Sequence, residues 1–226
     1  MESAAKRAYL LPLVGLFTGV PGAALTLLGY NLPPGVVATL ALAVVLLAAG
    51  FHHTDGVLDT GDALMVRGTQ ERRRAVLKDA RVGVGAIGAL FVIYAPALAA
   101  LVALVDDSPA RAALALLASE ISSRSAMLLA LAFGKPAEPG SSSVPFVRYL
   151  KGWRRTSGLS LALLAPLLCL LPLGGFAPLA VVSVPLTVLI ALQIARRAFG
   201  GIGGDVIGAA GEATRTVLLV VLSSMT

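Results

Sequence analysis

Three aspartates near residue 60 have the spacing that most clearly points to chemistry. The stretch HHTDGVLDTGD at positions 52–62 contains Asp55, Asp59 and Asp62, four and then three residues apart. On an α-helix of about 3.6 residues per turn, these positions fall within roughly 60° of one another. Carboxylates on one narrow stripe repel each other, and a cation such as Mg²⁺ or Mn²⁺ relieves that repulsion. The stretch therefore predicts a metal site, with a solvated acidic helix face as the alternative.

A second acidic pattern lies near the C-terminus. Gly201, Asp205, Gly208 and Glu212 follow one another at intervals of four, three and four residues. On a helix they form one stripe, in which the glycines let a neighbouring helix approach and the carboxylates face that neighbour. The stripe predicts a role for both acids in metal binding or catalysis, with helix packing and solvated acids as the alternative.

Four cationic residues are candidates for binding phosphate groups. Arg67, Lys78 and Arg81 follow the acidic stretch, and Arg124 lies in an apolar segment four residues after Glu120. Guanidinium and ammonium groups pair well with phosphate oxygens. The alternatives are interface anchoring for Lys78 and Arg81 and simple pairing with Glu120 for Arg124.

The composition indicates how these residues are positioned. Of 226 residues, 57% are hydrophobic and 13% charged, whereas about a quarter of a soluble domain is charged. Apolar runs of about 20 residues span a bilayer, and we predict an all-α, polytopic membrane bundle forming a single domain, 1–226. The seven expected spans are 8–29, 34–51, 82–104, 110–132, 158–174, 177–195 and 205–224. Because the fifth and sixth expected spans contain prolines, which kink or break helices, the number of spans is expected to lie between six and eight.

The basic residues predict the orientation of this bundle. Fifteen of the 18 Lys and Arg residues precede the first span or lie in alternate connections, with Arg111 and Arg215 assigned to the opposite side. By the positive-inside rule the N-terminus and the connections 52–81 and 133–157 are cytoplasmic, the latter with an interfacial helix. We therefore expect a multi-pass cell-membrane protein with a cytoplasmic active site. Since no soluble basic domain is present, nucleic-acid binding is excluded.

Three motifs resemble those of one enzyme family. They are HTDGVLDTGDAL at 53–64, KDARVG at 78–83 and GGIGGDVIGA at 200–209.

 The three motifs occur in the same order as in the cobalamin-5′-phosphate synthase family (adenosylcobinamide-GDP ribazoletransferase), and the resemblance covers most of the chain. Gly203 is a departure, because the family pattern has threonine there and its hydroxyl is lost.

The resemblance implies a Mg²⁺-dependent transfer, with Mn²⁺ as an alternative ion. Adenosylcobinamide-GDP and α-ribazole or its 5′-phosphate would yield adenosylcobalamin or its 5′-phosphate and GMP. The expected metal ligands are Asp55, Asp59, Asp62 and Asp205, the catalytic groups His53, Asp79 and Glu212, and the phosphate contacts Arg67, Lys78, Arg81 and Arg124. Whether His52 or His53 matters, and whether the protein is a homo-oligomer, stays open.

Two other classes of membrane protein remain as alternatives. Asp59, Asp62 and Arg67 approximate the first half of a CDP-alcohol phosphotransferase motif, but its second half is absent after Arg67. A cation-coupled transporter would also use intramembrane acids. It would need them near the middle of the bilayer, whereas here they cluster at the predicted cytoplasmic mouth.

Overall fold

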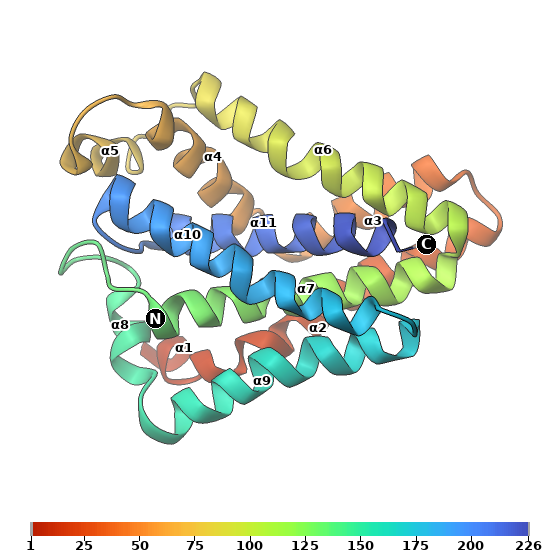
Figure 1. Cartoon of the computed structure of the whole chain (residues 1–226). Helices are drawn as coiled ribbons and strands as arrows, with labels where there is room; N and C mark the ends of the chain where they lie inside the picture. The colour runs from red at the N-terminus through yellow and green to blue at the C-terminus, as the bar shows by residue number, and fades with distance from the viewer. Residues whose placement is uncertain (1, 226) are drawn as a thin grey trace.

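Helices make up the whole fold in the computed structural model, which describes residues 2–225 (Figure 1). An isolated bridge between Pro136 and Ile202 is the one β-type contact in that range. The helices are α1 (Glu2–Lys6), α2 (Leu11–Thr26), α3 (Pro34–Ala48), α4 (His52–Met65), α5 (Gln70–Val76), α6 (Val84–Asp107), α7 (Pro109–Phe133), α8 (Val144–Tyr149), α9 (Gly152–Leu170), α10 (Ser183–Phe199) and α11 (Gly204–Ser223), with short 3₁₀ turns η1 (Ala8–Leu10), η2 (Leu27–Tyr30), η3 (Leu171–Leu173) and η4 (Ala177–Val182). The predicted all-α class is confirmed.

The long helices agree with the predicted spans. Six continuous helical segments in the described range are long and apolar enough to cross a membrane: Ala8–Tyr30, Val84–Asp107, Pro109–Phe133, Gly152–Leu173, Ala177–Phe199 and Gly204–Ser223. The second predicted span, 34–51, contains only α3, and α4 lies in the region expected as the connection 52–81. The two helices form a pair bent by 92°. Counting this pair as one span gives the seven crossings expected from the sequence. The connection after α7 contains α8, and α9 already begins at Gly152.

The break between α3 and α4 has a local backbone cause. Gly50 has φ +64° and Phe51 has φ +58°, so both residues are in the left-handed region. Glycine adopts that conformation freely, whereas a residue with a side chain pays about 1–2 kcal/mol. The two residues end α3 and redirect the chain, so that the acidic stretch becomes a helix of its own rather than a continuation of the span.

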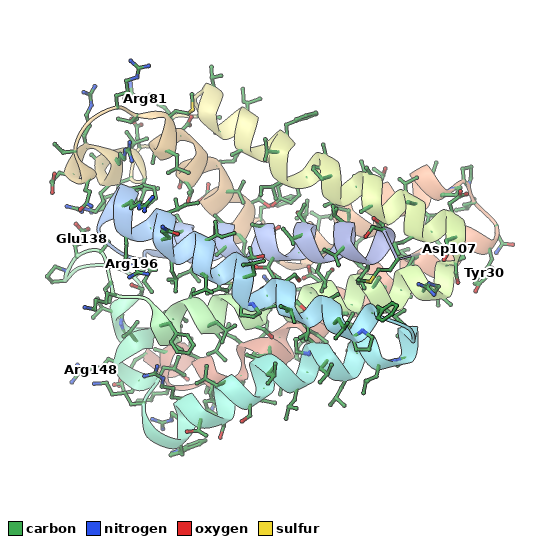
Figure 2. The ribbon with its side chains drawn as sticks, in the orientation of Figure 1. Tyr30, Arg81, Asp107, Glu138, Arg148 and Arg196 are labelled. Atoms are coloured by element: carbon green, nitrogen blue, oxygen red, sulfur yellow. The ribbon has the colours of Figure 1, made fainter. Side chains whose placement is uncertain are left out.

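The basic connections gather at one end of the bundle. Figure 2 labels Arg81, Glu138, Arg148 and Arg196 at the end where α5 and α8 lie, and Tyr30 and Asp107 at the other. We call the first of these the basic end. This arrangement follows from the alternation of spans, because every second connection returns to the same end. It agrees with the predicted clustering of positive charge.

Helix α7 forms the centre of the bundle and contacts α2, α9 and α11. Its residues 112–118 belong to one buried apolar cluster and residues 126–131 to another. Between them lies a buried polar segment that contains Glu120 and Arg124. Close packing with α2 depends on glycine, because a Cβ added at Gly15 would lie 2.6 Å from the Cα of Ile121. The charged middle of α7 is therefore enclosed by helices.

Candidate active site at the basic end

The three aspartates of α4 lie on one helix face, as their spacing predicts. Asp55, Asp59 and Asp62 line a pocket of about 290 Å³. The opposite wall is the 77–82 segment between α5 and α6, which contributes Lys78 and Arg81. We call this space the acidic pocket. It brings carboxylates and cationic side chains from two sequence motifs together.

Asp62 also has a structural role that the spacing does not predict. Its Oδ2 accepts a hydrogen bond of 2.6 Å from the backbone N–H of Gly83, and its Oδ1 accepts one of 2.8 Å from the N–H of Ala86. These donors belong to the first turn of α6, where N–H groups lack helical partners and the helix dipole favours negative charge. Asp62 therefore caps α6 and fixes α4 against it.

The C-terminal acidic stripe meets α4 near this pocket. Gly56 of α4 packs on the backbone of Asp205, and a Cβ added at Gly56 would lie 2.6 Å from the Asp205 carbonyl oxygen. Repulsion from Asp55, Asp205 and Asp62 acts on the Asp59 carboxylate. Residues about 150 positions apart in the sequence thus share one electrostatic environment. Figure 1 shows α11 running through the middle of the bundle beside α4.

We expect the Gly56→Ala variant to unfold at a lower temperature than the wild type, because the added methyl group pushes α4 away from α11. Gly88→Ala is the matched control, since a Cβ at this position of α6 meets nothing within 4 Å. Thermal unfolding in detergent measures the difference. Equal melting temperatures for the two variants would mean that the Gly56 contact does not hold the helices together.

The donor set fits a hard divalent cation. Carboxylate oxygens are the ligands that Mg²⁺ and Mn²⁺ prefer, and clustered like charges favour a cation among them. Among residues 2–225, however, no three His, Cys, Asp or Glu side chains form a ready-made coordination site. Binding would therefore require the carboxylates to move closer to one another.

The predicted phosphate-binding residues occupy different places. The Nζ of Lys78 lies 2.7 Å from Oε1 of Glu138, and Arg81 forms an ion pair with Asp79. Lys78 lines both the acidic pocket and a neighbouring pocket of about 260 Å³, which reaches Gly204 and Asp205 at the start of α11. Arg67 is exposed after the end of α4 and lines neither pocket.

Asp79 is held in its ionised form. Two nitrogens of the Arg81 side chain and the Arg81 backbone N–H donate to its carboxylate, at 2.6–3.2 Å. Hydrogen bonds to the charged form favour that form, and those from Arg81 lower the pKa of Asp79 to about 2. The carboxylate therefore stays negative at neutral pH and is a weak base.

Arg124 and Glu212 lie in a buried network of charges away from the acidic pocket. Arg215 is fully buried and pairs with both Glu120 and Glu212. Arg124 lies 3.6 Å from Glu120 and approaches Nδ1 of His53 at 2.8 Å. The network also includes hydroxyl groups: Tyr94 donates to Glu212 at 2.9 Å, and Thr18 donates to Glu120 at 2.7 Å.

Arg215 does not lie on the side opposite the basic loops, where the sequence places it. It is 0% exposed inside α11. Its position three residues after Glu212, within an apolar span, is the signal that indicates an ion pair. Its partner on another helix, Glu120 of α7, lies 95 positions away in the sequence, so no local spacing indicates that pair.

Known proteins similar to this chain agree on one family. A family model described as cobalamin-5-phosphate synthase matches residues 1–223. Three similar proteins are each named adenosylcobinamide-GDP ribazoletransferase. The one from Pyrobaculum calidifontis is 37% identical over 95% of this chain and 88% of its own length. The one from Methanocella arvoryzae is 32% identical over 99% and 88%, and the one from Methanosarcina barkeri is 28% identical over 96% and 82%.

No solved structure matches the chain. The family model covers residues 1–223, including the acidic stretch of α4, the 78–83 segment and the start of α11, and the relatives cover nearly all of the chain. The chain therefore belongs to the cobalamin-5-phosphate synthase family.

Proposed function

We propose that this protein is a Mg²⁺-dependent adenosylcobinamide-GDP ribazoletransferase. A hydroxyl group of α-ribazole or α-ribazole 5′-phosphate attacks the cobinamide-linked phosphorus, a new phosphodiester forms, and GMP leaves. The observation that carries this proposal is the acidic pocket, where two of the three family motifs face each other and the third begins beside them. The relatives supply the names of the substrates.

The aspartates around the pocket would hold the metal ion. Asp55, Asp59 and Asp205 have carboxylates available for this role, whereas Asp62 already accepts two backbone hydrogen bonds. We propose that Asp62 chiefly orients α4 and offers its remaining lone pairs to the ion. When held there, Mg²⁺ would supply positive charge against the phosphoryl oxygens and would favour an in-line displacement.

The cationic residues would bind the phosphate groups of the donor substrate. Lys78 serves this role best, because it lines both pockets and its side chain is 70% exposed. The start of α11 adds backbone N–H groups beside the second pocket, and a helix N-terminus favours anions. Arg81 lies at the rim of the acidic pocket, where Asp79 orients it.

Two predicted catalytic groups fit supporting roles better. Asp79, with a pKa of about 2, is a weak proton acceptor; we propose that it holds Arg81 in place. Both oxygens of Glu212 are occupied by Arg215 and Tyr94. We propose that Glu212 stabilises the helices around the pocket.

The activity is tested directly with the purified protein in detergent. We expect GMP to be released from adenosylcobinamide-GDP when α-ribazole and Mg²⁺ are both present, and not when EDTA removes the ion. Release of CMP from a CDP-alcohol lipid, with no GMP from the cobinamide substrate, would favour the phosphotransferase alternative. Absence of both reactions would overturn the proposed function.

We further propose that the basic end faces the cytoplasm, where nucleotide substrates are made. The chain has a single cysteine, Cys169, which a serine replaces in this experiment. In the Cys169→Ser background, Gly140→Cys is expected to react with a membrane-impermeant thiol reagent only after cells are opened. Gly140 is exposed and has free space around it. Asn31→Cys, at the other end, is the matched control and should react in intact cells. The reverse pattern of labelling would invert the orientation.

A further inference from the structure

The buried charge network is joined to the first turn of α4 at two consecutive residues. Nδ1 of His53 lies 2.8 Å from Nη1 of Arg124, and the hydroxyl groups of Thr54 and Tyr94 are 2.9 Å apart. Tyr94 donates its single hydroxyl proton to Glu212, so Thr54 is the donor in their contact. The next residue in the chain is Asp55 of the acidic pocket.

The contact with Arg124 fixes where the proton of the His53 ring resides. A guanidinium group has five N–H donors and no acceptor. Nδ1 must therefore accept the hydrogen bond, and the ring carries its proton on Nε2. Arg124 itself is held in place by Glu120 and is 2% exposed. Among the described residues, no protein group forms a hydrogen bond with Nε2 of His53.

We propose that His53 and Arg124 are positioning residues for the metal-binding aspartates, and that His53 acts through Nδ1 as a hydrogen-bond acceptor. Arg124, on central helix α7, holds the start of α4 through this bond, and Tyr94 on α6 supports the same turn through Thr54. The direction in which Asp55 and Asp59 point is thereby set from the interior of the bundle. This inference rests on the proposed metal-dependent function.

Three replacements of His53 distinguish this role from one that uses Nε2. The side-chain oxygen of asparagine can take the place of Nδ1, whereas the amide of glutamine reaches the position of Nε2. Loss of a residue that supports metal ligands typically weakens metal binding about 10- to 100-fold. We expect such a loss in His53→Ala and His53→Gln, and apparent Mg²⁺ affinity close to wild type in His53→Asn.

The apparent affinity is read from the rise in melting temperature as Mg²⁺ is added, and the same order of variants is expected for the rate of GMP release. The proposal that the contact between Nδ1 of His53 and Arg124 positions the aspartates would be overturned if His53→Gln bound Mg²⁺ better than His53→Asn. It would also be overturned if His53→Asn were as weak as His53→Ala.

A spectroscopic test does not depend on substrates or on metal. The chain has two histidines, so the exposed His52→Asn variant leaves His53 as the only one. Nitrogen-15 NMR of this protein in detergent should show an unprotonated Nδ1 and a protonated Nε2. A proton on Nδ1 would refute the contact with Arg124, whatever the activity of the enzyme. If the NMR result holds while wild-type protein shows no response to Mg²⁺, the proposed function fails and the contact stands.

Discussion

Replacing Asp59 by asparagine is expected to abolish metal-dependent transfer while the protein still inserts and folds. Asp59 is flanked by Asp55, Asp62 and Asp205, so a cation in this region would lie near its carboxylate. Loss of groups that only support metal ligands costs about 10- to 100-fold, and loss of a ligand should lower the rate of GMP release by more than about 100-fold. The rate is measured at saturating substrate and Mg²⁺.

Asp106→Asn is the matched control for this experiment. It makes the same chemical change at an exposed position at the other end of the bundle, outside both pockets. We expect the control to release GMP at the wild-type rate. Turnover of Asp59→Asn at the rate of Asp106→Asn would remove Asp59 from the proposed metal site.

A related result is expected for the C-terminal stripe. A ligand that binds only the folded protein stabilises it, by about 2.7 kcal/mol at a concentration of 100 times its Kd. Mg²⁺ should therefore raise the melting temperature of the wild type, and the rise should be much smaller in Asp205→Asn. If Asp205→Asn keeps the full rise and normal GMP release, the start of α11 contributes only its packing against Gly56.

Local spacing was enough to predict the helices and the acidic face. The apolar runs correspond to the spans, and the intervals between Asp55, Asp59 and Asp62 place them on one side of α4. The glycine stripe was also informative, since a Cβ at Gly208 would lie 3.3 Å from the Cα of His53. These features depend on residues close together in the sequence, and helix geometry fixes their relations.

The interactions between helices could not be predicted in the same way. Capping of α6 by Asp62 depends on how α4 and α6 cross, and the bend at Gly50 and Phe51 decides that crossing. Gly201 of the stripe packs against the backbone at Lys135 in a loop rather than against another helix. Such contacts join residues whose separation in the sequence carries no information about their distance in space.

The largest loss of stability is expected in Arg215→Met. This change leaves Glu120 and Glu212, both 0% exposed, without their shared guanidinium partner. Removing one partner of a buried ion pair typically costs 3–5 kcal/mol, so we expect the free energy of unfolding to fall by about that amount. Arg111→Met is the matched control: it breaks a partly exposed pair with Asp107 and should cost no more than about 1 kcal/mol.

A double variant separates the stability of the network from the chemistry of the enzyme. Combining Arg215→Met with Glu212→Gln removes one charge of each sign and leaves Glu120 paired with Arg124. We expect this protein to be more stable than Arg215→Met in the same unfolding measurement; if it is not, uncompensated charge is not the cause of the loss. GMP release by the folded double variant would mean that Glu212 serves the buried network and is not needed for the reaction. A folded but inactive protein would mean that the Glu212 carboxylate takes part in the reaction.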